Sequence, residues 1–550
     1  MNFFVNFIKS ALRATLGVAI LLFAAGIPAH FVETSKEAVV AAGVDTQSAY
    51  SIAQIYLDAA KISSAELLLK ADGASKDVVS RFKAIYDSHP QWIVSGGDEP
   101  FFATFYSTIS DAEKASAPVA VYPILSTSDA RKKLLDFLSQ ADLGIVKKII
   151  SMRTLNTLLI PPVYTSAGAP LEAALLTNAL LAQAGDFDRL FLRDISSLLD
   201  TAKTDTAARD TFEKYCIATV AFSKRMDWTL LRSVVSNFKS LSEAYEFAKV
   251  YEAAPNEDLR ASLVAGMLLI GRPADCAKYL SGANQKKWED FAFAYRNGEG
   301  SLNFLLSQGN PIYENSFVAD FIEPICGIIK ARLGVFGATY PTVALALKVI
   351  LSVLGGYLFI RGLIRIFICH RDTPSWHSPL ALMRGMIEGV IVSVLFFLVI
   401  EPEDFKIKIA ENSPTPELRF AFDKVMNTME GEIMKFETDT ATITAVGLFL
   451  ALQFTVYLIS LIRLSVIKRT KADASLKLKL LENEENLFDL GLYIGLAGTV
   501  VSLILLTMGV VTASLMAAYA STLFGILFTA LIKIVHVRKY KRALLIESAK

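Results

Sequence analysis

The chain has 550 residues, of which 53% are hydrophobic and only 20% are charged, and its net charge is +1. This composition departs from that of an average soluble domain and indicates membrane-spanning segments. The near-zero net charge gives no indication of nucleic-acid binding, so we expect no nucleic-acid partner.

The first apolar run covers 14–27, follows Lys9 and Arg13, and ends among small residues. This pattern is typical of a signal peptide cleaved near Ala29, and an uncleaved anchor fits it nearly as well. We therefore assign 1–31 to a signal peptide or N-terminal anchor. Either alternative places the residues that follow on the far side of the membrane.

Residues 32–340 are rich in charged residues, whereas long apolar runs dominate after Thr342. Residues 32–340 also lack the period-two pattern of strands. Helical patterns such as Ser48–Lys70 are separated by short polar breaks, and Leu171–Thr201 predicts two helices joined at Gly185-Asp186. We expect an exported, periplasmic helical domain over 32–340, either an irregular α-solenoid or a bundle. A docking surface is its favoured role, and a spacer is the alternative.

Metal and thiol chemistry have little support in the sequence. Cys216, Cys276 and Cys326 fall in the predicted exported domain, where buried thiols are favoured over a disulfide. Cys369 lies near two histidines, but their number and spacing do not fit a zinc site. We expect no metal, no cofactor and no catalytic residues.

Five further apolar runs, each near the ~20 residues that a bilayer requires, predict spans. They cover 343–361, 384–400, 442–462, 488–508 and 513–533. Basic residues are concentrated in 361–382, in 463–487 and in the C-terminal tail, whereas 401–440 is acidic, so the positive-inside rule places 401–440 outside. The predicted all-α fold thus continues as a transmembrane hairpin (341–402), an acidic periplasmic loop (403–440), a membrane core (441–535) and a basic cytoplasmic tail (536–550).

Two charged residues fall inside the predicted spans of the hairpin. Glu388 lies four residues after Arg384, and we favour pairing of the two on one helix face over a relay role for Glu388. Lys348 lies about one turn into its span, and we expect it to snorkel to the outer surface.

The last two spans carry stripes of small and hydroxyl residues. Most members are spaced by three or four residues, which places them on one helix face. Such stripes allow helices to pack closely in lipid. The hydroxyl groups favour a second interpretation, in which they face a passage. The stripes contain Gly491, Gly495, Gly498, Thr499 and Ser502 in the first span and Ser521, Thr522, Gly525 and Thr529 in the second.

The segment 492–500, LYIGLAGTV, resembles the GLxGTV signature of the MotA/TolQ/ExbB proton-channel family, and 521–525, STLFG, resembles its Thr-x-x-Gly. The resemblance covers only the C-terminal part, 441–535. It implies that Thr499 and Thr522 occupy pore positions. We expect Ser502 and Ser521 beside them in the ion pathway, and the four glycines of the stripes, Gly491, Gly495, Gly498 and Gly525, at helix contacts.

The two striped spans contain no ionisable residue within the hydrocarbon stretch, although a proton relay through lipid normally needs one. The resemblance implies that a single-span partner of the MotB/TolR/ExbD type supplies it, enclosed by a homo-oligomeric ring, expected to be a pentamer. We therefore expect a non-enzymatic, energy-transducing ion channel subunit of the bacterial inner membrane. Its exported domain would contact a periplasmic or outer-membrane protein, and membrane lipid would surround its spans. The alternative is a non-conducting membrane scaffold whose exported domain recruits partners.

Overall fold

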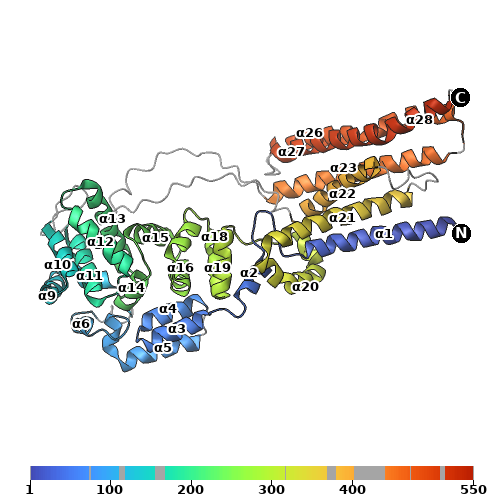
Figure 1. The fold of residues 1–550 in the computed structure, drawn as a ribbon. Coiled ribbons are helices and arrows are strands. Elements are labelled where there is room, and N and C mark those ends of the chain that lie inside the picture. The colour runs from blue at the N-terminus through green and yellow to red at the C-terminus, as the bar shows by residue number, and fades with distance from the viewer. Residues whose placement is uncertain are drawn as a thin grey trace. The chain divides into compact units, whose positions relative to one another are not determined.

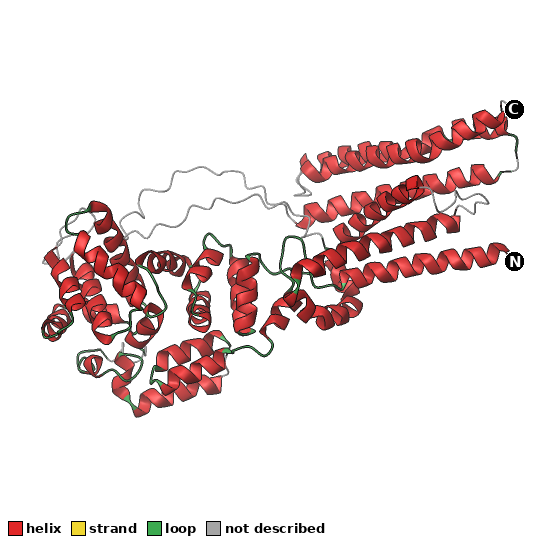
Figure 2. Cartoon of the chain, in the orientation of Figure 1, coloured by secondary structure: helices red, strands yellow, loops and turns green. Residues whose placement is uncertain are grey.

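A computed structural model describes residues 2–73, 76–110, 118–154, 168–315, 317–367, 379–401, 440–470, 472–507 and 515–548. Within these ranges the chain is helical and contains no β-strand (Figure 2). The all-α prediction is confirmed at this level. The predicted acidic loop over 403–440 lies outside the described residues except for Thr440, and Cys369 and its neighbouring histidines lie outside them too.

The chain forms two compact units (Figure 1). The helical unit is Val39–Ile312, and the membrane unit contains the chain up to Ala38 together with the described residues from Tyr313 onward. Short helix α2 (Lys36–Gly43) crosses the first boundary. The second boundary lies earlier than the expected position at 340, because the helix that follows Tyr313 packs with the membrane helices.

The helical unit consists of short helices, some of which bury one face while others are buried nearly all round. Its helices are α3 (Ala49–Asp58), α4 (Ile62–Ala71), α5 (Lys76–Ser88), η1 (Pro90–Val94), α6 (Pro100–Ala103), α8 (Val121–Ser126), α9 (Ser128–Ser139), α10 (Gly144–Ser151), η2 (Met152–Thr154), α11 (Ala169–Ala184), α12 (Arg189–Thr201), α13 (Thr206–Ser223), α14 (Trp228–Val235), α15 (Leu241–Ala253), α16 (Glu257–Ile270), α17 (Pro273–Leu280), α18 (Gln285–Arg296) and α19 (Glu299–Gln308).

Local sequence signals set several of these helix ends. Gly185 adopts a left-handed conformation with φ 77° after α11, and Asp188 caps α12 by accepting a hydrogen bond from the Leu190 amide, so the predicted pair of helices is confirmed. The single helical segment predicted for Ser48–Lys70 is instead two helices, α3 and α4. The break occurs where Ala60 takes φ 56°, a conformation that alanine seldom adopts and that the sequence does not signal.

The core of the helical unit lies between successive helix pairs. Helices α11, α13, α15 and α17 contact one another in that order, and α16 contacts α4 and α18. Aromatic side chains fill the centre, where Phe222 lies with its ring centroid 5.8 Å from that of Phe238 and 5.6 Å from that of Tyr251. This succession of neighbouring helices agrees with a repeat-like array, although the α-solenoid form stays a prediction.

The membrane unit consists of long, apolar helices and several short or polar ones. They are α1 (Asn2–Ala25), α20 (Phe317–Thr339), α21 (Pro341–Phe367), α22 (Pro379–Ile400), α23 (Thr440–Arg469), α24 (Ala474–Asn483), α25 (Glu485–Phe488), α26 (Leu490–Thr507), α27 (Leu515–Leu531), the π-helical turn η6 (Ile532–Val537) and α28 (Arg538–Ser548).

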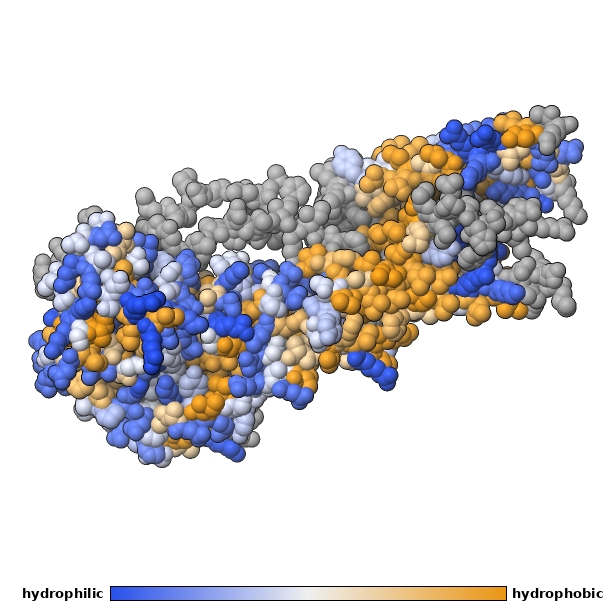
Figure 3. Space-filling model, in the orientation of Figure 1, coloured by the Kyte–Doolittle hydropathy of each residue, from blue (hydrophilic) through white to orange (hydrophobic). Residues whose placement is uncertain are grey.

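Four helices in the described part of the chain are long and apolar enough to cross a membrane. They contain the segments Phe7–Ala25, Pro341–Ile366, Phe449–Arg469 and Tyr519–Ser548. The apolar stretches of α22 and α26 that the structure describes, Gly385–Ile400 and Leu490–Val500, are shorter. Figure 3 shows apolar side chains gathered over the membrane unit and a largely hydrophilic surface over the helical unit.

Helix α1 is part of this bundle, because it packs along α21. A Cβ atom on Gly17 would lie 2.4 Å from the Phe359 backbone nitrogen, and one on Gly362 would lie 2.5 Å from the Ala14 nitrogen. Such approach requires residues without side chains at the contact. Of the two alternatives for the N-terminal segment, this packing favours the retained anchor.

Candidate functional site

Helices α26 and α27 form the centre of the candidate site, and they contact each other closely along their length. Neither helix contains a charged residue. Both are rich in large aliphatic side chains, and their small residues recur at helical spacing on the face that each turns to the other. We call this contact the α26–α27 seam.

Backbone-to-backbone contact in the seam depends on glycine. A Cβ atom on Gly495 would lie 2.8 Å from the Ser521 carbonyl oxygen and 3.2 Å from the Cα of Gly525. A Cβ atom on Gly525 would lie 2.6 Å from the Gly491 carbonyl oxygen. These distances are shorter than ordinary contacts of a Cβ atom, so a larger residue would force the two helices apart. The predicted packing role of these glycines thus agrees with their position.

The two hydroxyls singled out in the sequence meet across the seam. The side chains of Thr499 and Thr522 share a hydrogen bond, and both lie within hydrogen-bond distance of the Gly495 carbonyl oxygen, at 3.0 and 3.3 Å. Thr499 is buried and Thr522 is half-buried. Because each hydroxyl can donate and accept, the pair can exchange its shared hydrogen bond for one to an incoming polar group.

Further polar atoms lie on either side of this pair. Ser521 is fully buried, and a Cβ atom on Gly498 would meet its hydroxyl oxygen. From α23, Gln453 donates its Nε2 to the Gly491 carbonyl oxygen at 3.0 Å. Three buried oxygens at this place have no hydrogen-bond partner among the described residues: Ser521 Oγ, Gln453 Oε1 and Thr529 Oγ1.

Buried polar oxygens without a hydrogen bond are uncommon in proteins and are costly in an apolar environment. Their presence here means that the seam holds more hydrogen-bonding capacity than packing alone uses. The side chain of Ser502, which we placed in the same pathway, lies outside the described side chains. The sequence analysis missed Gln453, although a single amide within an apolar run of 442–462 was a signal for it.

At one end of the seam, two ion pairs join Lys533 of η6, the turn that continues α27, to the segment before α26. The Lys533 ammonium lies 2.7 Å from Asp489 Oδ2 and 3.7 Å from Glu485 Oε1. The same π-helical turn, η6, buries His536, whose Nε2 lies 3.0 Å from the Tyr457 hydroxyl of α23. Such π-turns are frequent at functional positions.

A buried ion pair lies elsewhere in the membrane unit, among α1, α21 and α22. The Lys348 ammonium donates to both carboxylate oxygens of Glu401 at 2.9 and 2.7 Å and to the Ala29 carbonyl oxygen at 2.7 Å. His30 lies 3.7 Å from Glu401 and stacks on Tyr313. The expectation that Lys348 would snorkel is therefore wrong. Its side chain is only 2% exposed, because Glu401 provides an internal partner.

Two other sequence predictions concern charge and thiols. Glu388 is buried, but the side chain of Arg384 lies outside the described side chains, so their pairing stays a prediction.

The three described cysteines are free, buried thiols. Burial raises the pKa of the Cys216 and Cys276 thiols, which favours the unreactive protonated form. No group of three or more His, Cys, Asp or Glu side chains that could hold a metal occurs within the described ranges.

The helical unit contains a buried carboxylate, Asp227, whose hydrogen bonds hold two helices together. Asp227 Oδ1 accepts hydrogen bonds from the Ser63 hydroxyl at 2.7 Å, the Thr229 hydroxyl at 3.0 Å and the Leu230 amide at 3.0 Å. Burial raises the pKa of Asp227 to about 6, even though these hydrogen bonds lower it. The contacts join α4 to the start of α14.

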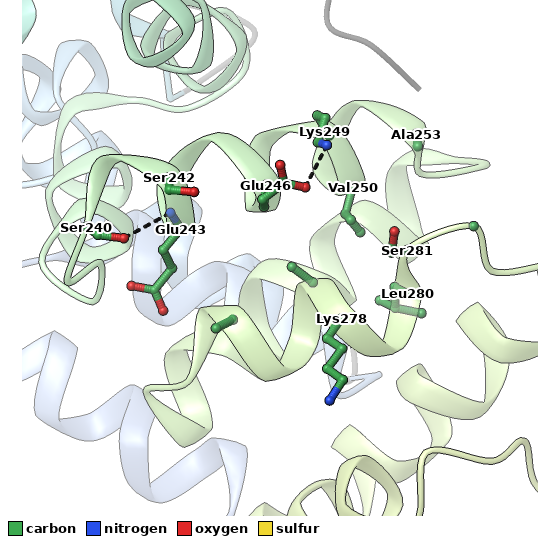
Figure 4. Close-up of a pocket in the computed structure, with 13 residues that line it drawn as sticks. Ser240, Ser242, Glu243, Glu246, Lys249, Val250, Ala253, Lys278, Leu280 and Ser281 are labelled. Carbon is green, nitrogen blue, oxygen red and sulfur yellow. Dashed lines mark hydrogen bonds and ion pairs between the residues drawn. The ribbon is translucent and has the colours of Figure 1, made fainter. Parts of the chain in front are cut away.

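The helical unit also has a groove of about 510 Å³ between α15 and α17 (Figure 4). Glu246 and Lys249 form an ion pair of 2.6 Å on one side, and Lys278 extends from the other side. The Ser240 hydroxyl accepts from the Glu243 amide and caps α15. The groove contains no catalytic arrangement and offers mixed polar and apolar surface.

Searches of protein-family models, curated proteins and solved structures found no match to this chain. The fold itself defines the class of protein. It is an all-helical membrane protein with four helices that could span a bilayer. A separate helical unit lies in the sequence between the first and the second of these helices.

Proposed function

We propose that the chain is a subunit of an energy-transducing ion channel in the bacterial inner membrane, in which several copies surround a single-span partner protein. The observation that supports this proposal best is the hydroxyl pair of the α26–α27 seam. Two threonines, which the sequence resemblance assigns to a pore, meet at a backbone carbonyl between two helices that carry no charge.

The seam offers the chemistry that a passing proton or a partner's carboxyl group needs. Thr499 and Thr522 now bond to each other, and a carboxylate that approached Thr522 would replace that neutral hydrogen bond by stronger charge-assisted ones. A partner group can approach Thr522 from the α27 side, because Thr522 is half-buried and its neighbours Tyr519 and Leu523 are 61% and 60% exposed. In this proposal a second helix covers that exposed apolar face.

In this proposal the ion carrier comes from another chain. Helices α26 and α27 contain no Asp, Glu, Lys, Arg or His. Moving a proton across the apolar layer normally requires an ionisable side chain. A membrane-embedded Asp on a single-span partner would supply it, and the unpaired oxygens of Ser521, Gln453 and Thr529 would provide further hydrogen-bonding groups nearby.

The helical unit serves in this proposal as an exported docking domain. The distribution of basic loop residues supports a location outside the inner membrane, where the domain would contact periplasmic or outer-membrane components. The groove between α15 and α17 is the described surface on which we place such a contact.

Conduction is tested with Thr499→Val and Thr522→Val in the full-length protein, purified in mild detergent with any co-purifying single-span protein and reconstituted into liposomes. Valine keeps the shape of threonine but removes the hydroxyl. We expect both variants to keep the oligomeric state and to lose proton flux driven by a pH gradient. Thr455→Val is the matched control, because Thr455 is exposed on α23 and bonds only to the Ala451 carbonyl of its own helix. Wild-type flux in both seam variants refutes the channel proposal.

A non-conducting scaffold is the second candidate function. The closed Thr499–Thr522 hydrogen bond favours it, because that bond already satisfies one hydroxyl with the other and needs no ligand. In that case the two valine variants lower thermal stability but leave partner recruitment unchanged, and no co-purifying single-span protein with a membrane Asp is found.

A further inference from the structure

A second groove, of about 500 Å³, lies in the membrane unit between α24–α25 and α28. Helix α28 follows η6 without interruption, so the C-terminal tail, predicted only as basic, is a helix that packs on α24. The lining combines four basic, two acidic and four apolar side chains. They are Lys533, Arg538, Lys541 and Arg542; Glu482 and Glu485; and Leu481, Phe488, Val537 and Leu545.

The acidic residues of the groove neutralise its lysines. Lys533 pairs with Asp489 at 2.7 Å and with Glu485 at 3.7 Å. Lys541 lies 3.5 Å from Glu482. These ion pairs use every carboxylate in the lining, so the lysines add little net charge to the groove.

The two arginines differ from the lysines. Arg538 and Arg542 are four residues apart on α28, which places both on one helix face. Both are exposed, and neither has an ion-pair partner in the part of the chain that the structure describes. Two adjacent guanidinium groups without a counterion present up to ten N–H donors to an anion, in a geometry that suits phosphate oxygens.

The groove lies where a membrane-spanning helix leaves the apolar layer. The predicted span 513–533, whose ~20 residues suffice to cross the hydrocarbon core, ends five residues before Arg538. Arg538 and Arg542 follow within the next two to three turns, at the level of lipid headgroups. On the apolar side, Leu545 is 50% exposed, and Phe488 and Val537 line the wall.

We propose that this groove binds the headgroup of an anionic phospholipid, with Arg538 and Arg542 holding the phosphate and the apolar wall contacting the glycerol and the first carbons of the acyl chains. An ion without an apolar part would leave Leu545 and Val537 uncovered. A zwitterionic lipid would bring a cation next to two arginines. The combination of unpaired arginines, apolar wall and interfacial depth selects an anionic amphiphile.

The test uses the full-length protein, purified in mild detergent and delipidated, and titrated with phosphatidylglycerol, phosphatidylcholine or inorganic phosphate. Bound lipid is counted by native mass spectrometry. We expect saturable binding of phosphatidylglycerol, weakened about fivefold by Arg538→Gln and by Arg542→Gln, since each basic residue near an anionic surface contributes on the order of 1 kcal/mol. Circular dichroism verifies that the variants fold.

Lys539→Gln is the matched control. Lys539 is exposed on the same helix and carries the same charge, but it does not line the groove. The proposal predicts wild-type binding in this variant. Equal weakening by Lys539→Gln, or equal binding of phosphatidylcholine, overturns the proposal, because either result means that no defined headgroup site exists. Competition by inorganic phosphate at the same concentration as the lipid also overturns it, because the ligand is then free phosphate.

Discussion

Replacing Gly525 by alanine measures how closely α26 and α27 pack in the seam. The added Cβ would lie 2.6 Å from the Gly491 carbonyl oxygen, whereas ordinary contacts begin at 3.4 Å, so the helices would have to separate by about 0.8 Å. Overpacking of this kind costs about 1–3 kcal/mol. The same separation lengthens the Thr499–Thr522 hydrogen bond. We expect a lower midpoint of thermal unfolding in detergent and reduced proton flux in liposomes.

Gly447→Ala is the control for this variant. Gly447 also lies in a membrane helix, but a Cβ atom there would be 3.6 Å from Leu398 and 3.8 Å from Val399, which is ordinary contact. Both substitutions change helix propensity in the same way, so the difference between the two variants reports the close contact alone. If Gly525→Ala unfolds at the same temperature as Gly447→Ala, the two backbones do not meet as described and the argument from the seam fails.

Three further predictions concern other parts of the chain. Lys348→Met leaves the Glu401 carboxylate buried without its cation and should lower the free energy of unfolding by about 3–5 kcal/mol. Lys348→Met combined with Glu401→Gln should recover most of that loss in the same unfolding assay. An equal loss in the single and the double variant contradicts the ion pair. The pKa of Asp227 rises from 3.8 to about 6 on folding, so its contribution to stability is present at low pH and is lost as the pH rises through 6. When the pH is lowered from 7 to 5, the free energy of unfolding of the wild type should therefore rise by about 1 kcal/mol relative to that of Asp227→Asn. An unchanged difference between the two proteins contradicts this. Intact-mass measurement should find α1 on the mature protein, and a mass that corresponds to cleavage near Ala29 contradicts its packing on α21.

Patterns that depend on neighbouring residues in the sequence predicted the structure well. The helices of the seam, their small-residue faces and the break at Gly185 follow from helical spacing and from the preference of glycine for a left-handed helix end. The meeting of Thr499 and Thr522 agrees with the stripes, because two faces of small residues that pack together bring their hydroxyls into contact.

Features that depend on residues distant in the sequence were not predictable in this way. Lys348 alone resembles a snorkelling lysine, and only the folded bundle brings Glu401 and the Ala29 carbonyl to it. The Gln453 contact with Gly491 needs α23 beside α26, which no periodicity specifies. Ala60 interrupts a helix through its positive φ although alanine is the strongest helix former, and its carbonyl oxygen accepts a hydrogen bond from the distant Asp98 amide at 3.3 Å.

The pairing of α1 with α21 imposes an order on the assembly of this protein. The Ala29 carbonyl and the Lys348 ammonium that bonds to it are 319 residues apart along the chain. The ribosome therefore synthesises the whole helical unit before α21, the partner of α1, exists. Until then the face of α1 that contains Gly17 has no helix of this chain packed on it. Domains generally fold in the order in which they are synthesised. In that order of synthesis the helical unit has its whole sequence available before α21 can complete the membrane bundle.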